Sequence, residues 1–146
     1  MSMTLRDWLD ALERHDLLAR IGQRVHVNQL AAIIEQNHRR ATLFEDIQGY
    51  ALPLAANTFS NRAMMALALG CDEEDILATL TNKREMRIEP VVIADAPCQE
   101  IVEEGAAVNL ANLPLHLQHE LDGAPFISAA VMVARDPVRG VSNLGI

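Results

Sequence analysis

The sequence predicts an α/β or α+β domain over residues 1–112, followed by the first strands of a β unit over residues 113–146. Short helical and strand patterns alternate through the first part, as they do in α/β and α+β domains. Residues 122–146 carry no helix signal and contain a run of small and β-branched residues, Ile127–Ala134. The change follows a loop-like stretch punctuated by Pro114, which places the boundary near residue 112.

The first helix is predicted to begin just after Thr4, whose hydroxyl can cap it. Apolar residues then recur at helical spacing: Leu5, Trp8, Leu9 and Leu12. Short strands are predicted at Leu17–Ile21 and Arg24–Val27, on either side of a turn, and a second short helix at Gln29–Asn37. This order gives a helix, two strands and a helix in the first 37 residues.

Two further strands are predicted at Thr42–Ile47 and Leu52–Thr58, joined by a glycine turn. Asn61 is a predicted cap for a helix that runs to about Leu69, and Gly70 has the position of a left-handed C-cap. Four acidic residues then open another helix, because carboxylates are stabilised at the positive end of the helix dipole. Those residues are Asp72, Glu73, Glu74 and Asp75.

Beyond these helices the pattern predicts β structure. Pro90–Ala94 and Cys98–Val102 have the composition of strands, the first of them buried. Asp136–Gly140 is a predicted turn between strands, since Pro137 suits the turn and a glycine supplies positive φ. The chain therefore reaches Ile146 partway into a predicted hairpin.

Composition and charge exclude several classes of protein. The net charge of −8 argues against non-specific binding to nucleic acid or to anionic lipid, which needs a basic surface. Two cysteines, Cys71 and Cys98, are far apart and predict neither a disulfide framework nor a structural zinc site. No stretch has the length and apolarity of a signal peptide or a membrane span. We expect a soluble, cytoplasmic protein.

A few residues could carry chemistry. His116, His119 and Glu120 could bind a divalent metal, but they lie in a predicted loop rather than on a rigid helix face. Asp122 can accept backbone N–H groups in a turn. Cys98 has an acidic neighbour, Glu100, where a catalytic thiolate needs a positive one.

The last residues combine a hard ligand with a small residue. Asn143 offers a carbonyl oxygen suited to Mn²⁺ or Mg²⁺, and Gly145 lets a backbone approach a ligand closely. The local pattern also fits the plain start of a strand, so both interpretations stay open on these residues alone.

Six stretches, taken in order, resemble the N-terminal part of the UbiD family of prenylated-flavin-dependent decarboxylases. They are "LRDWLDALERHDLLARI", "ATLFEDIQGYALPLAANTF", "SNRAMMALALG", "APCQEIV", "VNLANLPL" and "DGAPFISAAVMVARDPVRGVSNLGI". The likeness runs almost from end to end of the chain. It implies that residues 113–146 begin a flavin-binding domain with a split β-barrel fold.

The resemblance also assigns site residues. Asn143 corresponds to an Asn that helps hold a divalent metal bridging to the cofactor phosphate. Gly145 and Ile146 lie beside the flavin in the family, and Ser128 takes the place of a Thr near the phosphate. Ala124 replaces the family's usual second Gly. The implied cofactors are prenylated FMN and Mn²⁺, with K⁺ possible.

The family's reaction is the reversible, non-oxidative decarboxylation of aromatic or α,β-unsaturated carboxylic acids. The Arg and two acidic residues that assist it fall beyond Ile146, so no catalytic residue is expected in these 146 residues. We therefore expect an N-terminal piece of a larger, self-associating enzyme, inactive by itself.

Two alternatives stay open. The chain could be a short non-catalytic subunit that pairs with a catalytic chain and covers its open strand edge. It could also be an unrelated metal-binding protein centred on His116 and His119, whose metal affinity would survive removal of Asn143.

Overall fold

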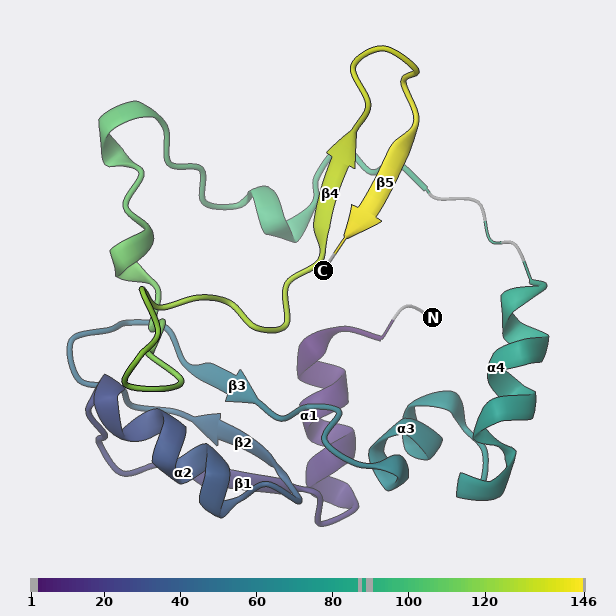
Figure 1. Cartoon of the computed structure of the whole chain (residues 1–146), viewed down its shortest axis with the longest axis horizontal. Helices are drawn as coiled ribbons and strands as arrows, with labels where there is room; N and C mark the ends of the chain where they lie inside the picture. The colour runs from purple at the N-terminus through teal and green to yellow at the C-terminus, as the bar shows by residue number, and fades with distance from the viewer. Residues whose placement is uncertain (1–2, 87, 89–90, 146) are drawn as a thin grey trace.

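A computed structural model describes residues 3–86, 88 and 91–145 (Figure 1). Helices and strands are mixed along the chain, which agrees with the predicted fold class. The helices are α1 (Leu5–Arg14), α2 (Leu30–Gln36), α3 (Arg62–Leu69) and α4 (Ile76–Arg84). The strands are β1 (Leu18–Ile21), β2 (Ala41–Phe44), β3 (Leu54–Ala56), β4 (Met132–Arg135) and β5 (Ser142–Gly145). Among the described residues, no helix has the length and apolarity needed to cross a membrane.

The first three strands form one sheet with the order β1-β2-β3. Strands β1 and β2 are parallel, because the connection through α2 returns the chain to the same end of the sheet. Strands β2 and β3 are antiparallel and follow each other directly, with Leu43 opposite Ala55. Strand β3 is therefore an edge strand, with one side free of pairing within this sheet.

Helices cover both faces of this sheet. Successive side chains of a strand point to opposite faces, and β2 shows this alternation. Leu43 packs against the cluster that contains Leu12 of α1 and Met64 of α3. Phe44 packs on the other face with Leu30 of α2. Leu12, Leu30, Phe44 and Met64 are all fully buried. The core is therefore mainly aliphatic, with the rings of Phe44 and Trp8 as its buried aromatic groups among the described residues.

The predicted helix caps are confirmed. The Thr4 hydroxyl accepts a hydrogen bond from the Asp7 N–H, and the Asp7 carboxylate accepts one from the Thr4 N–H at 2.9 Å. Asn61 caps α3 by accepting from the Met64 N–H at 3.0 Å. Gly70 ends α3 with a φ of 70°, in the left-handed region that favours glycine.

Three predicted strands are wrong in part or whole. Residues 91–94 form no strand, and Pro90 lies outside the described residues. Pro97–Gln99 forms a 3₁₀ turn where a strand was expected. The stretch Arg24–Val27 contributes only an isolated bridge, between Val25 and Ile47. A strand needs a partner as well as β-branched composition, and the described residues place none beside Val91–Ile93.

The second half of the chain is much more exposed than the first. Strands β4 and β5 form an antiparallel hairpin that projects away from the three-stranded sheet (Figure 1). All the residues of its two strands are exposed. Among the described residues after position 90, only Pro114 and His116 are buried. His116 lines a cavity together with residues of β3, so this segment lies against the first half of the chain.

The hairpin turn follows the prediction. The Asp136 carboxylate accepts hydrogen bonds from the N–H groups of Val138, at 2.8 Å, and Arg139, at 3.1 Å. Those two bonds, the Arg139 one foremost, lower the pKa of Asp136. Gly140 completes the turn with a φ of 68°.

Candidate functional site

One face of the β4–β5 hairpin carries the predicted metal ligand. Asn143 and Gly145 are two residues apart on β5, so they share a face. The residues opposite them on β4 are Ala134 and Met132, respectively. Asn143 thus has small neighbours on two sides, and its amide is exposed above an open surface.

The space beside Gly145 is empty within the described chain. A Cβ added at this glycine would meet no heavy atom within 4 Å, so the protein's own packing does not require a glycine here. An approaching ligand is one reason for a residue without a side chain at such a position. Ile146, the other residue predicted beside the flavin, lies outside the described residues.

These residues fit part of a cofactor and metal site. Asn143 offers one hard oxygen, whereas hard divalent cations take about six oxygen ligands. Among the described residues, no group of three or more His, Cys, Asp or Glu side chains could hold a metal ion. The face of β5 could therefore supply one ligand and an open approach, and the remaining ligands must come from elsewhere.

Ser128 lies in a different place from this face. It precedes β4 and lines a cavity beside β3. The Gln118 side-chain N–H donates to the Ser128 hydroxyl oxygen at 3.5 Å, which leaves the hydroxyl hydrogen free to donate to an anion. No hydrogen bond between described residues joins Ser128 to β5. The structure therefore places Asn143 and Gly145 on one face of β5, and Ser128 in the lining of the cavity beside β3.

Asp122 shapes the loop that carries Gln118. Its carboxylate accepts the backbone N–H groups of Gln118, at 3.2 Å, and His119, at 2.9 Å. The prediction that Asp122 accepts backbone N–H groups is thus confirmed. Gln118 was not identified from the sequence, because its contact spans ten residues and no local pattern signals it.

The two histidines of the loop differ in environment. His116 is only 8% exposed, and its buried Nε2 has no hydrogen-bond partner among the described residues. Burial lowers the pKa of His116, so the ring is neutral at pH 7. His119 is exposed. A metal held by both rings finds no support in this arrangement.

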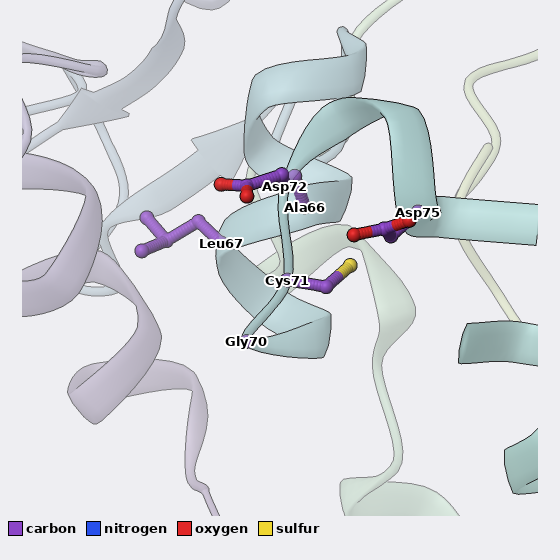
Figure 2. Close-up of a pocket in the computed structure, with 6 residues that line it drawn as sticks. All are labelled: Ala66, Leu67, Gly70, Cys71, Asp72 and Asp75. Carbon is purple, nitrogen blue, oxygen red and sulfur yellow. The ribbon is translucent and has the colours of Figure 1, made fainter. Parts of the chain in front are cut away.

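A second cavity, of about 540 Å³, lies at the C-terminal end of α3 (Figure 2). Figure 2 shows the Cys71 thiol among its lining residues, with Asp72 and Asp75 also at the rim. None of the six residues that line it is basic, so nothing there favours a thiolate. Cys98 is exposed and free, and it lies in the turn that replaces the predicted strand.

Two domain families match the chain. Residues 9–84 match the 3-octaprenyl-4-hydroxybenzoate carboxy-lyase N-terminal domain. Residues 90–146 match the Rift-related domain of the same carboxy-lyase. The two matches follow each other in one order and together cover most of the chain.

Relatives and solved structures agree with these families. An uncharacterized protein in the cooM 5′ region of Rhodospirillum rubrum is 30% identical over 145 residues, which cover 94% of this chain and 31% of that protein. The UbiD-class enzyme HmfF from Pelotomaculum thermopropionicum, in an evolved dimeric form with prFMN, superposes with a TM-score of 0.89 at 31% identity. That match covers 98% of this chain and 34% of HmfF.

Vanillic acid decarboxylase of Sedimentibacter hydroxybenzoicus, in an open form with truncated ShVdcD, gives a TM-score of 0.82 at 29% identity. This match covers 99% of the present chain and 35% of the decarboxylase chain. The chain thus spans about a third of the length of the proteins it matches.

Proposed function

Because this chain belongs to the UbiD family, as the resemblance predicted, and matches the N-terminal portion of its members, we propose that it forms part of a decarboxylase. The reaction is the reversible, non-oxidative removal of CO₂ from an aromatic or α,β-unsaturated carboxylic acid. The observation that carries the proposal is the agreement over 98% of the chain with a prFMN-bound enzyme, at a TM-score of 0.89.

The proposed role of this chain is to hold the cofactor. Bound prenylated FMN supplies the electron sink for the electron pair that remains when CO₂ leaves. Asn143 supplies one oxygen to a divalent metal, Mn²⁺, and K⁺ is a further candidate ion of the full-length enzyme. Gly145 leaves room for the flavin. Ser128 donates to the phosphate, and Ile146 lies beside the ring. We propose the domain division 1–112 and 113–146, with a split β-barrel in the second.

The isolated chain is proposed to be inactive. The described residues supply one metal ligand, and the hairpin strands expose Met132, Val133 and Leu144 by 65–72%. Apolar strands without a partner are aggregation-prone, so more protein must cover them in the working enzyme. We propose that this cover is the remaining two-thirds of the family architecture, in a cytoplasmic homo-oligomer.

A second candidate is a non-catalytic subunit that pairs with a separate catalytic chain. The exposed β4–β5 edges favour it as well, because a partner chain could cover them. The intact mass of the protein from its complete reading frame separates the two candidates. A mass about three times that of this chain supports the first, and 16.1 kDa supports the second.

Asn143→Ala in the protein expressed from its complete reading frame, with flavin and Mn²⁺ content as the readout, tests the cofactor site. We expect the metal content to fall at least tenfold, because one ligand and its orientation are lost. Asn143→Asp keeps an oxygen ligand and should retain the metal. Asn82→Ala, on the exposed α4, is the matched control. Unchanged metal and flavin in Asn143→Ala would show that this residue does not belong to the site.

A further inference from the structure

Two polar side chains that line the cavity beside β3 are joined to each other. This cavity has a volume of about 400 Å³, and both Gln118 and Ser128 border it. The Gln118 side-chain N–H donates to the Ser128 hydroxyl oxygen at 3.5 Å. The two residues are ten positions apart, so the bond joins the loop around residue 118 to the segment that leads into β4. A change in the Gln118 side chain therefore acts directly on the Ser128 hydroxyl.

The bond from Gln118 restricts where the Ser128 hydroxyl hydrogen can point. A serine hydroxyl has one hydrogen and two lone pairs, and it rotates to suit its partners. Because the amide N–H occupies one lone pair, the hydroxyl hydrogen must point away from Gln118. Ser128 is exposed, so packing restrains this rotation little. The bond from Gln118 therefore orients a hydroxyl that would otherwise turn freely.

The backbone of Gln118 is itself held in place. The Asp122 carboxylate accepts the backbone N–H of Gln118 at 3.2 Å and that of His119 at 2.9 Å. Hydrogen bonds to an ionised carboxylate are stronger than bonds between neutral groups. His116, two residues before Gln118, is buried. The Gln118 side chain therefore starts from an ordered backbone, and only its own torsions remain to be fixed.

The same arrangement turns the nearby negative charge away from the cavity. Asp122 does not line the cavity, and its carboxylate faces the two backbone N–H groups of the loop. Gln118 and Ser128 are neutral, and each can present a donor. An anion in the cavity therefore meets the Ser128 hydroxyl without facing the carboxylate that holds the loop.

We propose that Gln118 is a positioning residue for the cofactor phosphate, because it orients the Ser128 hydroxyl to donate to that phosphate. The inference rests on the proposed function, which places Ser128 at the phosphate. A donor that is oriented before the ligand arrives loses less entropy on binding, so the complex is tighter. Gln118 acts through Ser128 and does not itself contact the phosphate.

Flavin binding to the protein expressed from its complete reading frame tests this role. FMN carries the phosphate and riboflavin lacks it, so their Kd values, measured by quenching of flavin fluorescence, separate phosphate binding from ring binding. Ser128→Ala should raise the Kd of FMN about tenfold, because hydrogen bonds to charged groups are the strong ones. Gln118→Met has a similar length and no N–H donor, and it should raise the Kd of FMN about threefold. The Kd of riboflavin should not change in either variant.

The double variant Ser128→Ala/Gln118→Met shows whether Gln118 acts through Ser128. It should bind FMN as Ser128→Ala does, because no hydroxyl is left to orient. A further loss of FMN affinity in the double variant would mean that Gln118 contacts the phosphate itself, which contradicts the positioning role. Gln48→Met makes the same change at an exposed position outside this cavity, and it should leave both Kd values unchanged.

The remaining outcomes separate this inference from the proposed function. If Ser128→Ala weakens FMN binding and Gln118→Met does not, the inference fails and the proposed function stands. If Gln118→Met weakens riboflavin as much as FMN, its role is structural and the inference fails again. If Ser128→Ala leaves FMN binding unchanged, the phosphate role of Ser128 fails together with the inference.

A shorter amide keeps the test available if Gln118→Met does not fold. Gln118→Asn retains the amide but is one carbon shorter, and the bond to Ser128 is already 3.5 Å long. The shortened side chain therefore should not reach Ser128, and Gln118→Asn should raise the Kd of FMN and spare that of riboflavin. Wild-type affinity for FMN in Gln118→Asn would refute the proposal.

Discussion

Replacing Thr42 by Val should stabilise the protein, although it removes a polar group. Thr42 is fully buried in the central strand β2, and its hydroxyl oxygen has no hydrogen-bond partner among the described residues. Its cross-strand neighbours are Ala19 and Ala56, which have no side-chain group to offer. On folding, this hydroxyl therefore loses its hydrogen bonds to water and gains none within the described protein.

The size of the effect follows from that burial. A buried polar group without a partner costs about 1–3 kcal/mol. Valine has the same branched shape and puts a methyl group where the hydroxyl was, so it adds no cavity. We expect Thr42→Val to raise the free energy of unfolding by about 1–2 kcal/mol. With an m-value of about 2 kcal/mol/M, the urea midpoint should rise by roughly 0.5–1 M.

Urea unfolding followed by far-UV circular dichroism measures this change. Thr42→Ser keeps the hydroxyl and loses the methyl, so it should destabilise by about 0.8 kcal/mol. The expected order of stability is thus Val above Thr above Ser. Thr81→Val is the matched control, because that hydroxyl is exposed and donates to the Leu77 carbonyl at 2.8 Å. Its effect should stay within about 0.5 kcal/mol.

The opposite result at Thr42 would refute the reasoning. If Thr42→Val destabilises the protein by 1 kcal/mol or more, the hydroxyl has a hydrogen-bond partner in solution. A change confined to the m-value would point instead to the unfolded state.

Three other predictions concern pH and turns. Burial lowers the pKa of His116 in the folded protein, so as the pH falls the unfolded chain takes up the His116 proton before the folded chain does. The free energy of unfolding should therefore fall as the pH drops below about 6.5. His116→Phe should flatten this dependence in thermal melts from pH 8 to 5. The backbone N–H groups of the turn lower the pKa of Asp136, so the order of the β4–β5 hairpin should persist at pH 4 and decline as the pH falls further. The amide chemical shift of Arg139 measures this order. Asp136→Asn should show no such decline. Gly70→Ala should destabilise the protein by about 1 kcal/mol in urea unfolding, because φ is 70° there although the space around it is open. Gly123→Ala has equally open space and no positive φ, so it should have almost no effect. Equal effects of the two substitutions would contradict the conformational argument.

Local signals predicted the elements of the first half well. The Thr4 and Asn61 caps, the Gly70 terminus and the two strands around the glycine turn depend on residues within a few positions of one another. The local sequence determines such interactions. The parallel pairing of β1 with β2 depends on the tertiary structure, because the sequence of each strand would also allow pairing with another strand.

Local signals predicted strands wrongly where the described residues place no second strand beside the segment. Val91 and Val92 are 84% and 96% exposed, and Cys98 lies in a 3₁₀ turn. The predicted strands there depended on β-branched side chains, but a strand forms only where a second backbone supplies hydrogen bonds. The described residues supply none at these positions.

The sequence by itself determined the family, the caps and turns, and the spacing that puts Asn143 and Gly145 on one face of a strand. Each of these depends on residue order and on local backbone geometry. Only the tertiary structure decided that Ser128 lies beside Gln118 and β3, and that His116 is buried. It also formed the cavity that β3 and Ser128 line. The physical reason is that burial and contact across ten or more residues arise from packing between elements, which no local pattern in a single chain records.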